Sequence, residues 1–142
     1  MKLLESDFSN QVLKQVKTKI GDIFFFNHIA IIEFYEAVHV DVDNCTEIFN
    51  EIKTYFGDAR SFGIISNRIN SYSIKLLDVP LFRLQFKNLK GYAVVGYTPA
   101  SKMNAKIENN YCLSHNIDFD NIYEAVDFVY RKVRHEIQLS LY

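Results

Sequence analysis

The stretch Phe62-Gly63-Ile64-Ile65-Ser66-Asn67-Arg68-Ile69-Asn70-Ser71-Tyr72-Ser73 decides how this chain folds. Its first four residues are typical of a short buried strand, and they run directly into a polar segment rich in Asn and Ser. In an open α/β sheet, ligands and partners bind at the loops that leave the carboxyl ends of the strands. The stretch therefore predicts a central strand over residues 62–65, followed by a loop over residues 66–73 that carries the working surface.

The residues before this stretch predict an antiparallel start to the sheet. Residues 12–20 alternate between apolar and polar, Gly21-Asp22 is typical of a hairpin turn, and residues 23–35 are apolar enough for two further strands. A helix then begins at Asn44, which stands in capping-box relation to Glu47, and it ends at Gly57. We expect this helix to pack on the sheet and to connect the strands to residues 62–65.

The residues after the stretch predict alternating helices and strands, so the fold class is α/β with a mixed sheet. Leu81 and Leu84 are expected to point inward from the first of these later helices. The elements are, in order, a helix capped by Asp78 with Pro80 in its first turn, a buried strand over 90–97, a helix opened by Thr98-Pro99, a short edge strand at 117–119 and a final helix capped by Asn121.

Length and composition predict a single globular domain over residues 12–142, preceded by an arm over residues 1–11. The net charge of −1 provides no long-range field that would hold nucleic acid or an anionic membrane. No segment approaches the ~18 uninterrupted apolar residues that a membrane span needs. Acidic residues stand near the amino terminus where a signal peptide needs its apolar stretch, so we expect a cytoplasmic protein.

The residues that usually carry catalysis or bind metals do not form a recognisable pattern. The two cysteines, Cys45 and Cys112, have no metal or redox spacing and are expected to be reduced thiols. The four histidines are far apart in the sequence, and no nucleotide-binding or nucleophile-elbow motif is present. We therefore expect neither a metal nor a cofactor, and we expect that the protein is not an enzyme.

The order of elements resembles that of the STAS domain family, named for sulphate transporters and anti-sigma-factor antagonists. The chain is similar in particular to a divergent bacterial group that shares its fold with the lipid-binding CRAL-TRIO domains. The resemblance covers roughly residues 12–135. It rests on the hairpin into 29–35, the passage Gly63-Ile64-Ile65-Ser66-Asn67-Arg68, and the strand 91–97 followed by Thr98-Pro99.

The resemblance implies a switch by serine phosphorylation. In anti-sigma-factor antagonists the switch serine lies at the start of the helix after the central strand, in an Asp-Ser-Ser-Gly-like run. The matching positions here are Ser71 and Ser73, although no Asp precedes Ser71 and no Gly follows it. A phosphate adds about −1.5 to −2 charges and would recruit or repel a partner.

The candidate binding residues are Ser66, Asn67, Arg68, Asn70, Thr98 and Ser101. Two helix amino termini with the Arg68 guanidinium between them could hold an anion. The alternative interpretation is that the Asn and Ser side chains satisfy loop backbone and that Arg68 pairs with an acidic residue at the surface.

Two functional hypotheses follow. The first is a non-enzymatic regulatory module that binds a protein partner. The second, which the likeness to CRAL-TRIO domains implies, is a carrier of a small anionic or amphipathic molecule or a lipid. The aromatic residues Phe24, Phe25, Phe26 and Phe34 form either a plain core, or the lining of a pocket or of a homodimer seam.

Overall fold

The structure is a computed structural model, which describes the backbone of residues 1–112 and 117–140 and the side chains of residues 1–109 and 117–135. The predicted reduced thiol of Cys112 and one of the four histidines, His115, lie outside the described residues.

The chain builds a six-stranded mixed sheet, which confirms the predicted fold class. The first three strands form an antiparallel meander, and the remaining three continue the sheet in parallel. In spatial order the strands are β1 (Lys14–Lys17), β2 (Gly21–Phe25), β3 (Ile29–Phe34), β5 (Phe62–Arg68), β7 (Leu89–Gly96) and β8 (Asp118–Phe119).

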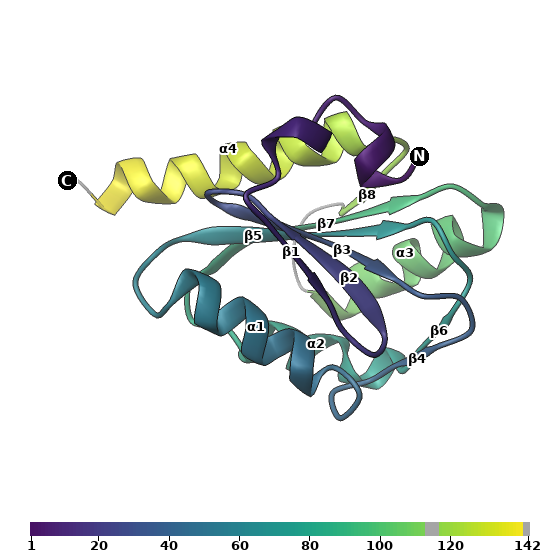
Figure 1. The fold of residues 1–142 in the computed structure, drawn as a ribbon. Helices are drawn as coiled ribbons and strands as arrows, with labels where there is room; N and C mark the ends of the chain where they lie inside the picture. The colour runs from purple at the N-terminus through teal and green to yellow at the C-terminus, as the bar shows by residue number, and fades with distance from the viewer. Residues whose placement is uncertain (113–116, 141–142) are drawn as a thin grey trace.

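Helices cover both faces of this sheet (Figure 1). One face packs against α1 (Thr46–Phe56), α2 (Val79–Leu84) and α3 (Pro99–Cys112), and the other packs against α4 (Ile122–Ser140). Next to α4 lie the 3-10 turns Leu3–Glu5 and Ser9–Gln11, so the expected arm carries Leu3, which is fully buried in the core. A third 3-10 turn, Leu76–Asp78, leads into α2.

Outside the main sheet, β4 (His39–Val40) pairs in parallel with β6 (Ser73–Ile74). The backbone amides of Ser73 and Lys75 donate hydrogen bonds to the carbonyls of Val38 and Val40. This small second sheet joins the segment after β3 to the segment after β5.

Residues of β5 alternate between the two sides of the sheet. Ile64 packs in the aromatic-rich core under α1 and α2, whereas Ile65 packs under α4. Gly63 lets α4 approach closely, because a Cβ atom there would lie 2.1 Å from Cγ1 of Val129. Phe24, Phe25 and Phe34 are buried within these cores, as the plain-core interpretation predicted, and Phe26 is half-buried. Phe34 also lines an apolar cavity within its core.

The predicted hairpin turn at Gly21-Asp22 is wrong by a few residues. Both residues belong to β2, and the turn is formed by residues 18–20. The hydroxyl of Thr18 accepts hydrogen bonds from the amides of Ile20 and Gly21 and donates one to the carbonyl of Gly21. Glycine is needed at position 21 because a Cβ atom would lie 2.9 Å from the carbonyl oxygen of Glu33 on β3.

The predicted end of the central strand is also wrong. Ser66, Asn67 and Arg68 continue β5 through Arg68 and are not in a loop. All three are buried, with exposed fractions of 3%, 0% and 5%. Their side chains bond to polar groups within the fold, and a polar side chain that has such partners can be buried. The polar residues 66–68 therefore did not have to form an exposed loop.

Two helix predictions need correction as well. The predicted capping box of Asn44 and Glu47 is not formed, and the N-cap residue of α1 is Cys45, without a side-chain hydrogen bond. The side-chain amide of Asn44 donates to the carbonyl of His39, and the carboxylate of Glu47 accepts from the amide of Lys19. Leu81 and Leu84, expected to face inward, are exposed. Asp78 is the N-cap residue of α2, as predicted, but its side chain makes no capping hydrogen bond and its carboxylate accepts the amide of Val42.

Other local predictions are confirmed. Gly57 ends α1 with a positive φ of 70°, and Pro80 lies in the first turn of α2. The side chain of Asn121 accepts a hydrogen bond from the amide of Glu124 at the start of α4. The buried stripe of α4 consists of Ile122, Ala125, Val129 and Val133.

Candidate functional site

The loops that leave β5 and β7 lie at the same edge of the sheet. The two strands are parallel neighbours, and Arg68 stands opposite Gly96. The chain segments that follow enclose a hollow of about 80 Å³, which we call the rim hollow. Its lining residues are Arg68, Asn70, Ser71, Tyr72, Ile74, Thr98, Ala100, Ser101 and Asn104. The structure thus brings together four of the six predicted binding residues, Arg68, Asn70, Thr98 and Ser101, with the predicted modification site Ser71. The other two, Ser66 and Asn67, do not line the rim hollow.

Thr98 and Ser101 bond to each other at the start of α3. The hydroxyl of Thr98 accepts a hydrogen bond from the amide of Ser101 at 3.1 Å, and the hydroxyl of Ser101 accepts one from the amide of Thr98 at 3.1 Å. This reciprocal pair satisfies amides that a helix start leaves free. It holds the turn at one wall of the rim hollow in a defined shape.

The opposite wall, the loop between β5 and β6, is tied to the segment that follows β3. The side-chain amide of Asn70 donates to the carbonyl of Phe34 at 2.9 Å, and the backbone amide of Ser71 donates to the carboxylate of Glu36 at 3.0 Å. The hydroxyl of Ser73 lies 2.7 Å from Nδ1 of His39. Ser71 and Ser73 are both exposed.

Arg68 forms a buried ion pair with Glu108 of α3. Both nitrogen atoms at the end of the guanidinium bond to the carboxylate, Nη2 at 2.7 Å from Oε1, and the two side chains are 4% and 2% exposed. Nε of Arg68 lies 3.4 Å from the hydroxyl of Ser66, which lies 3.3 Å from the hydroxyl of Tyr72. The charge of Arg68 is therefore neutralised within the fold and does not face solvent.

An apolar cavity of about 70 Å³ lies on the inner side of this ion pair, between the sheet and the helices α1 and α2. We call it the core cavity. Arg68, Glu108 and Ser66 form its polar end, and Arg68 and Ile74 line both this cavity and the rim hollow. The apolar part of the lining includes Ile32, Phe34, Ile48, Phe49, Ile64, Val79, Phe82 and Phe86.

Asn67 points to the opposite side of the sheet and builds a second polar cluster. Its side-chain amide donates to the carboxylate of Glu33 at 2.7 Å and to the carbonyl of Met1 at 3.0 Å. Its side-chain oxygen accepts from the hydroxyl of Tyr97 at 2.7 Å. The same carboxylate oxygen of Glu33 accepts the amide of Leu3 at 2.7 Å. Asn67 thus fixes the first residues of the chain on the sheet and does not reach the rim hollow.

Burial shifts the ionisation of both clusters. Burial raises the pKa of Glu33, and the hydrogen bonds from Leu3 and Asn67 offset this in part. Burial and the nearby Glu33 raise the pKa of Tyr97 to about 12. Burial alone would lower the pKa of Arg68, but Tyr72 and the Glu108 carboxylate raise it above its ordinary value. Arg68 therefore stays charged at any physiological pH.

Four polar residues of these clusters were not predicted from the sequence: Glu33, Tyr72, Tyr97 and Glu108. Glu33 left a signal, because it is the one charged residue in the apolar run 29–34. Glu108 lies three residues after Ala105, which is fully buried, so the two share a helix face. Neither pattern predicts which residue each acid bonds to. Arg68 and Glu108, for example, are 40 residues apart in the sequence.

Among the described side chains, no group of three or more His, Cys, Asp or Glu residues is placed to hold a metal ion. Burial raises the pKa of the Cys45 thiol to about 12, so this cysteine is not an activated nucleophile. None of the helices in the described part of the chain is long and apolar enough to span a membrane.

Comparison with known proteins identifies the fold. No protein-family model and no curated protein matches the sequence. The structure is similar to that of an uncharacterized protein from the DUF3478 family with a SpoIIAA-like fold, from Shewanella loihica PV-4. The similarity covers 82% of this chain and 90% of that chain, with a TM-score of 0.52 and 9% sequence identity. The predicted STAS-like fold is therefore confirmed, and this likeness concerns the fold alone.

The ion pair predicts a large asymmetry between single and double replacements. Glu108→Gln would leave the Arg68 charge buried without a counterion, and we expect it to lower the free energy of unfolding by about 3–5 kcal/mol. The double replacement Arg68→Met with Glu108→Leu removes both charges and should be close to neutral. Urea denaturation measures both.

The matched control is the exposed pair Asp127–Arg131, whose side chains are 59% and 76% exposed. Asp127→Asn should change the free energy of unfolding little, because exposed ion pairs contribute little. A Glu108→Gln variant as stable as Asp127→Asn would contradict the role assigned to the buried pair.

Glu33 predicts a specific pH dependence. Its raised pKa means that the folded state favours the protonated carboxyl, so its stabilising effect is complete below the ordinary value of 4.5 and is lost as the pH rises through the folded pKa. As the pH rises through the folded pKa of Glu33, the free energy of unfolding should therefore fall less for Glu33→Gln than for the natural protein. Urea midpoints measured across this pH range test it, with the exposed Glu124→Gln as control. Parallel curves for Glu33→Gln and the natural protein would contradict it.

Proposed function

We propose that this protein is a non-enzymatic cytoplasmic regulatory module of STAS type, and that it binds a protein partner at the rim hollow. The observation that carries the proposal is the meeting of two loops from neighbouring parallel strands, at the edge of the sheet where α/β folds bind their ligands. Both loops are held by local hydrogen bonds, so a partner would meet a surface that is already shaped.

The chemistry of the hollow suits recognition of a protein. Apart from Arg68, its polar lining includes the side-chain hydroxyls and amides of Asn70, Ser71, Thr98, Ser101 and Asn104, of which Ser71, Thr98 and Asn104 are exposed. The cation at its floor, Arg68, is already paired with Glu108, so an anion would have to compete with that carboxylate. A neutral hydrogen-bonding surface of this kind favours a polar face of a partner over a small anionic ligand.

Phosphorylation would act differently at the two candidate serines. A phosphate on Ser71 would lie beside the carboxylate of Glu36, which accepts the Ser71 amide, and like charges would repel. A phosphate on Ser73 would lie beside His39, whose ring can donate a hydrogen bond. We therefore expect modification of Ser71 to displace the loop, and modification of Ser73 to be accommodated.

Quantitative capture of partners on the immobilised protein tests this function. Ser71→Asp and the bulky replacement Ser101→Arg should each reduce the captured partner strongly, and Ser73→Asp should reduce it less. Ser9→Asp, at an exposed serine of the N-terminal turn Ser9–Gln11, is the matched control and should leave capture unchanged. Partners captured equally by all these variants would contradict binding at the rim hollow.

The core cavity favours a second candidate function, a carrier of a small amphipathic molecule. Its wall is apolar and its inner end offers the Ser66 hydroxyl beside a neutralised ion pair. With about 70 Å³ it is smaller than the ~150 Å³ engineered cavity that binds benzene. A ligand that fits without movement of α2 is therefore small, and a lipid would need α2 to shift.

Native mass spectrometry of gently purified protein tests the carrier function. A retained small molecule is expected in the natural protein and should be lost in Val79→Phe, which fills the core cavity from α2. Val16→Phe, on β1 outside the cavity, is the control for a valine enlarged elsewhere. A natural protein that is free of ligand in repeated preparations would argue against a carrier.

A further inference from the structure

The outer side of the segment that contains α2 is apolar. Between residues 75 and 87 the exposed side chains are Leu77, Pro80, Leu81 and Leu84, with Lys75 and Lys87 at the two ends. The three leucines are 72%, 43% and 77% exposed. The spacing of 77, 80, 81 and 84 places all four on one side of a helix. We call this surface the leucine stripe.

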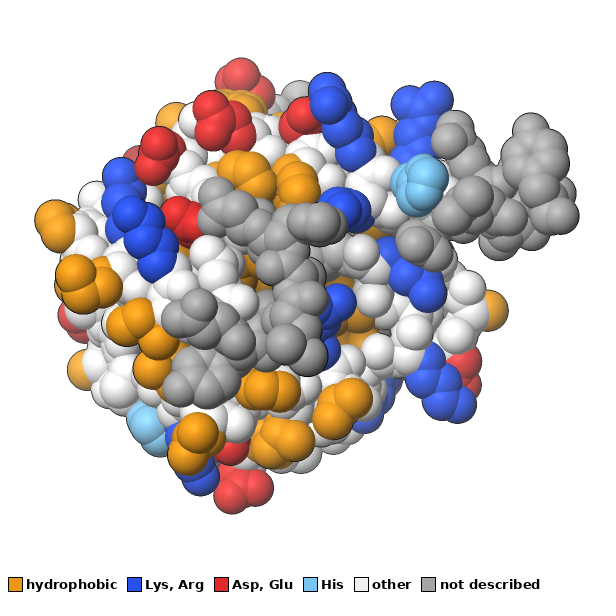
Figure 2. Space-filling view, turned by 180° about the vertical axis from the view of Figure 1, so that it is seen from behind, with side chains coloured by type: hydrophobic (Ala, Val, Ile, Leu, Met, Phe, Trp, Pro, Cys, Tyr) orange, Lys and Arg blue, Asp and Glu red, His pale blue; other side chains and the backbone are white. Residues whose placement is uncertain are grey.

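The leucine stripe is not the buried side of this segment, because other residues of the segment form its contact with the core. The buried residues of the same segment, Val79 and Phe86, together with the half-buried Phe82, pack toward α1, α3 and the sheet. Figure 2 shows hydrophobic side chains gathered along the lower edge of the molecule, where Figure 1 draws α2. The segment is therefore apolar on both sides, which a helix at the surface of a globular protein ordinarily is not.

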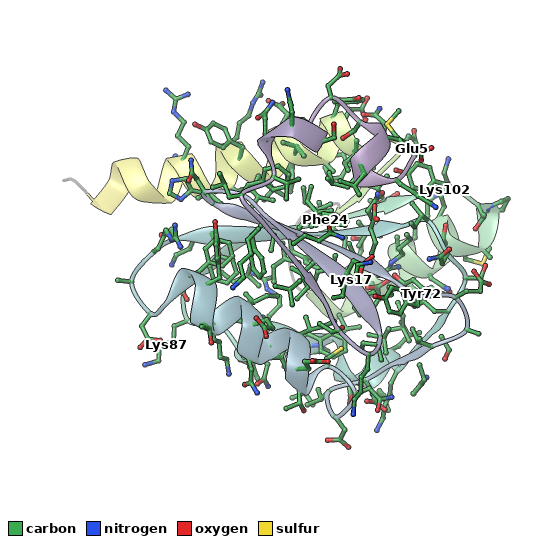
Figure 3. The ribbon with its side chains drawn as sticks, in the orientation of Figure 1. Glu5, Lys17, Phe24, Tyr72, Lys87 and Lys102 are labelled. Carbon is green, nitrogen blue, oxygen red and sulfur yellow. The ribbon has the colours of Figure 1, made fainter. Side chains whose placement is uncertain are left out.

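The segment that carries the stripe is mostly basic. Residues 75–87 contain three basic residues and one acidic residue, a net charge of +2 in a chain whose total is −1. The one acid, Asp78, is 9% exposed, and its carboxylate accepts the amide of Val42. The same carboxylate lies 3.9 Å from Nζ of Lys75, whose side chain is 55% exposed. Lys87 projects outward from the body of the molecule beyond the end of α1 (Figure 3).

We propose that the leucine stripe docks this protein onto an anionic lipid surface, with α2 lying in the plane of the interface. Leucine side chains flanked by lysines are the composition of helices that insert an apolar side between lipid headgroups while their cations meet anionic lipids. The inference is independent of the rim hollow, whose residues lie at the carboxyl edge of the sheet.

A second copy of the chain fits the stripe less well. A two-fold pairing along the stripe would bring Lys75 of one copy next to Lys87 of the other, and like charges repel. Four side chains are also far fewer than the roughly 20–30 residues a side of a stable protein interface. A lipid surface needs no such area, because adsorption uses a few inserted side chains together with attraction to the headgroups.

Flotation with vesicles tests the proposal on the intact chain. The natural protein should bind vesicles of phosphatidylcholine with phosphatidylserine, and it should bind pure phosphatidylcholine much less and lose binding at high salt. Leu77→Ser with Leu84→Ser should lower the partition coefficient by at least about tenfold. Lys75→Gln and Lys87→Gln should each lower it by roughly fivefold.

The matched control is Leu4→Ser with Leu13→Ser, which removes two leucines that are 53% and 59% exposed on the α4 side of the molecule. It should bind vesicles as the natural protein does. Three results would overturn the proposal: no flotation of the natural protein, equal flotation of the two double variants, or a dimer in sedimentation that the Leu77 and Leu84 replacements dissolve while vesicles stay unbound.

Discussion

The ion pair between Arg68 and Glu108 is the interaction on which the carboxyl edge of the sheet depends. Moving two charges out of water costs several kcal/mol for each ion, and it is tolerated only where geometry and additional hydrogen bonds are good. The pair meets this condition, because the Glu108 carboxylate accepts hydrogen bonds from both Nη atoms of Arg68, and Nε of Arg68 lies near the Ser66 hydroxyl. Glu108 can reach Arg68 only if α3 packs at one depth and rotation, with Ala105 buried one turn earlier. The start of α3 at Thr98, and with it one wall of the rim hollow, is placed by the same constraint.

The alternation of β5 gives this edge two polar clusters with different roles. Ser66 and Arg68 face the helices α1 to α3 and separate the rim hollow from the core cavity. Asn67 faces α4 and binds Glu33, Tyr97 and the backbone of the first residues. One strand end thereby fixes a helix on one side and the chain terminus on the other. The exposed loops between them rest on a rigid support, which is what a recognition surface requires.

Sequence reasoning succeeded where the structure depends on neighbouring residues. Thr98-Pro99 and Asn121 begin helices as predicted, and Gly57 ends one, because caps involve residues only a few positions apart. It failed at Asn67 and Arg68, whose main partners are 30 to 66 residues away in the sequence. It failed at Ser66 as well, because this residue continues β5 and is buried beside Arg68 and Tyr72. Sequence reasoning also wrongly predicted that Leu81 and Leu84 face the core. The spacing of apolar residues identifies one side of a helix, but it does not show whether that side meets the core or another surface.

The most direct test of this account is the solvent exchange of the Arg68 guanidinium, measured by nuclear magnetic resonance on protein labelled with nitrogen-15. A guanidinium enclosed by Glu108 and Ser66 should give separate Nη resonances whose hydrogens exchange slowly with water. Arg131, with a side chain 76% exposed, supplies the fast reference in the same spectrum. Exchange at Arg68 as fast as at Arg131 would contradict the buried pair and remove the support for the arrangement built on it.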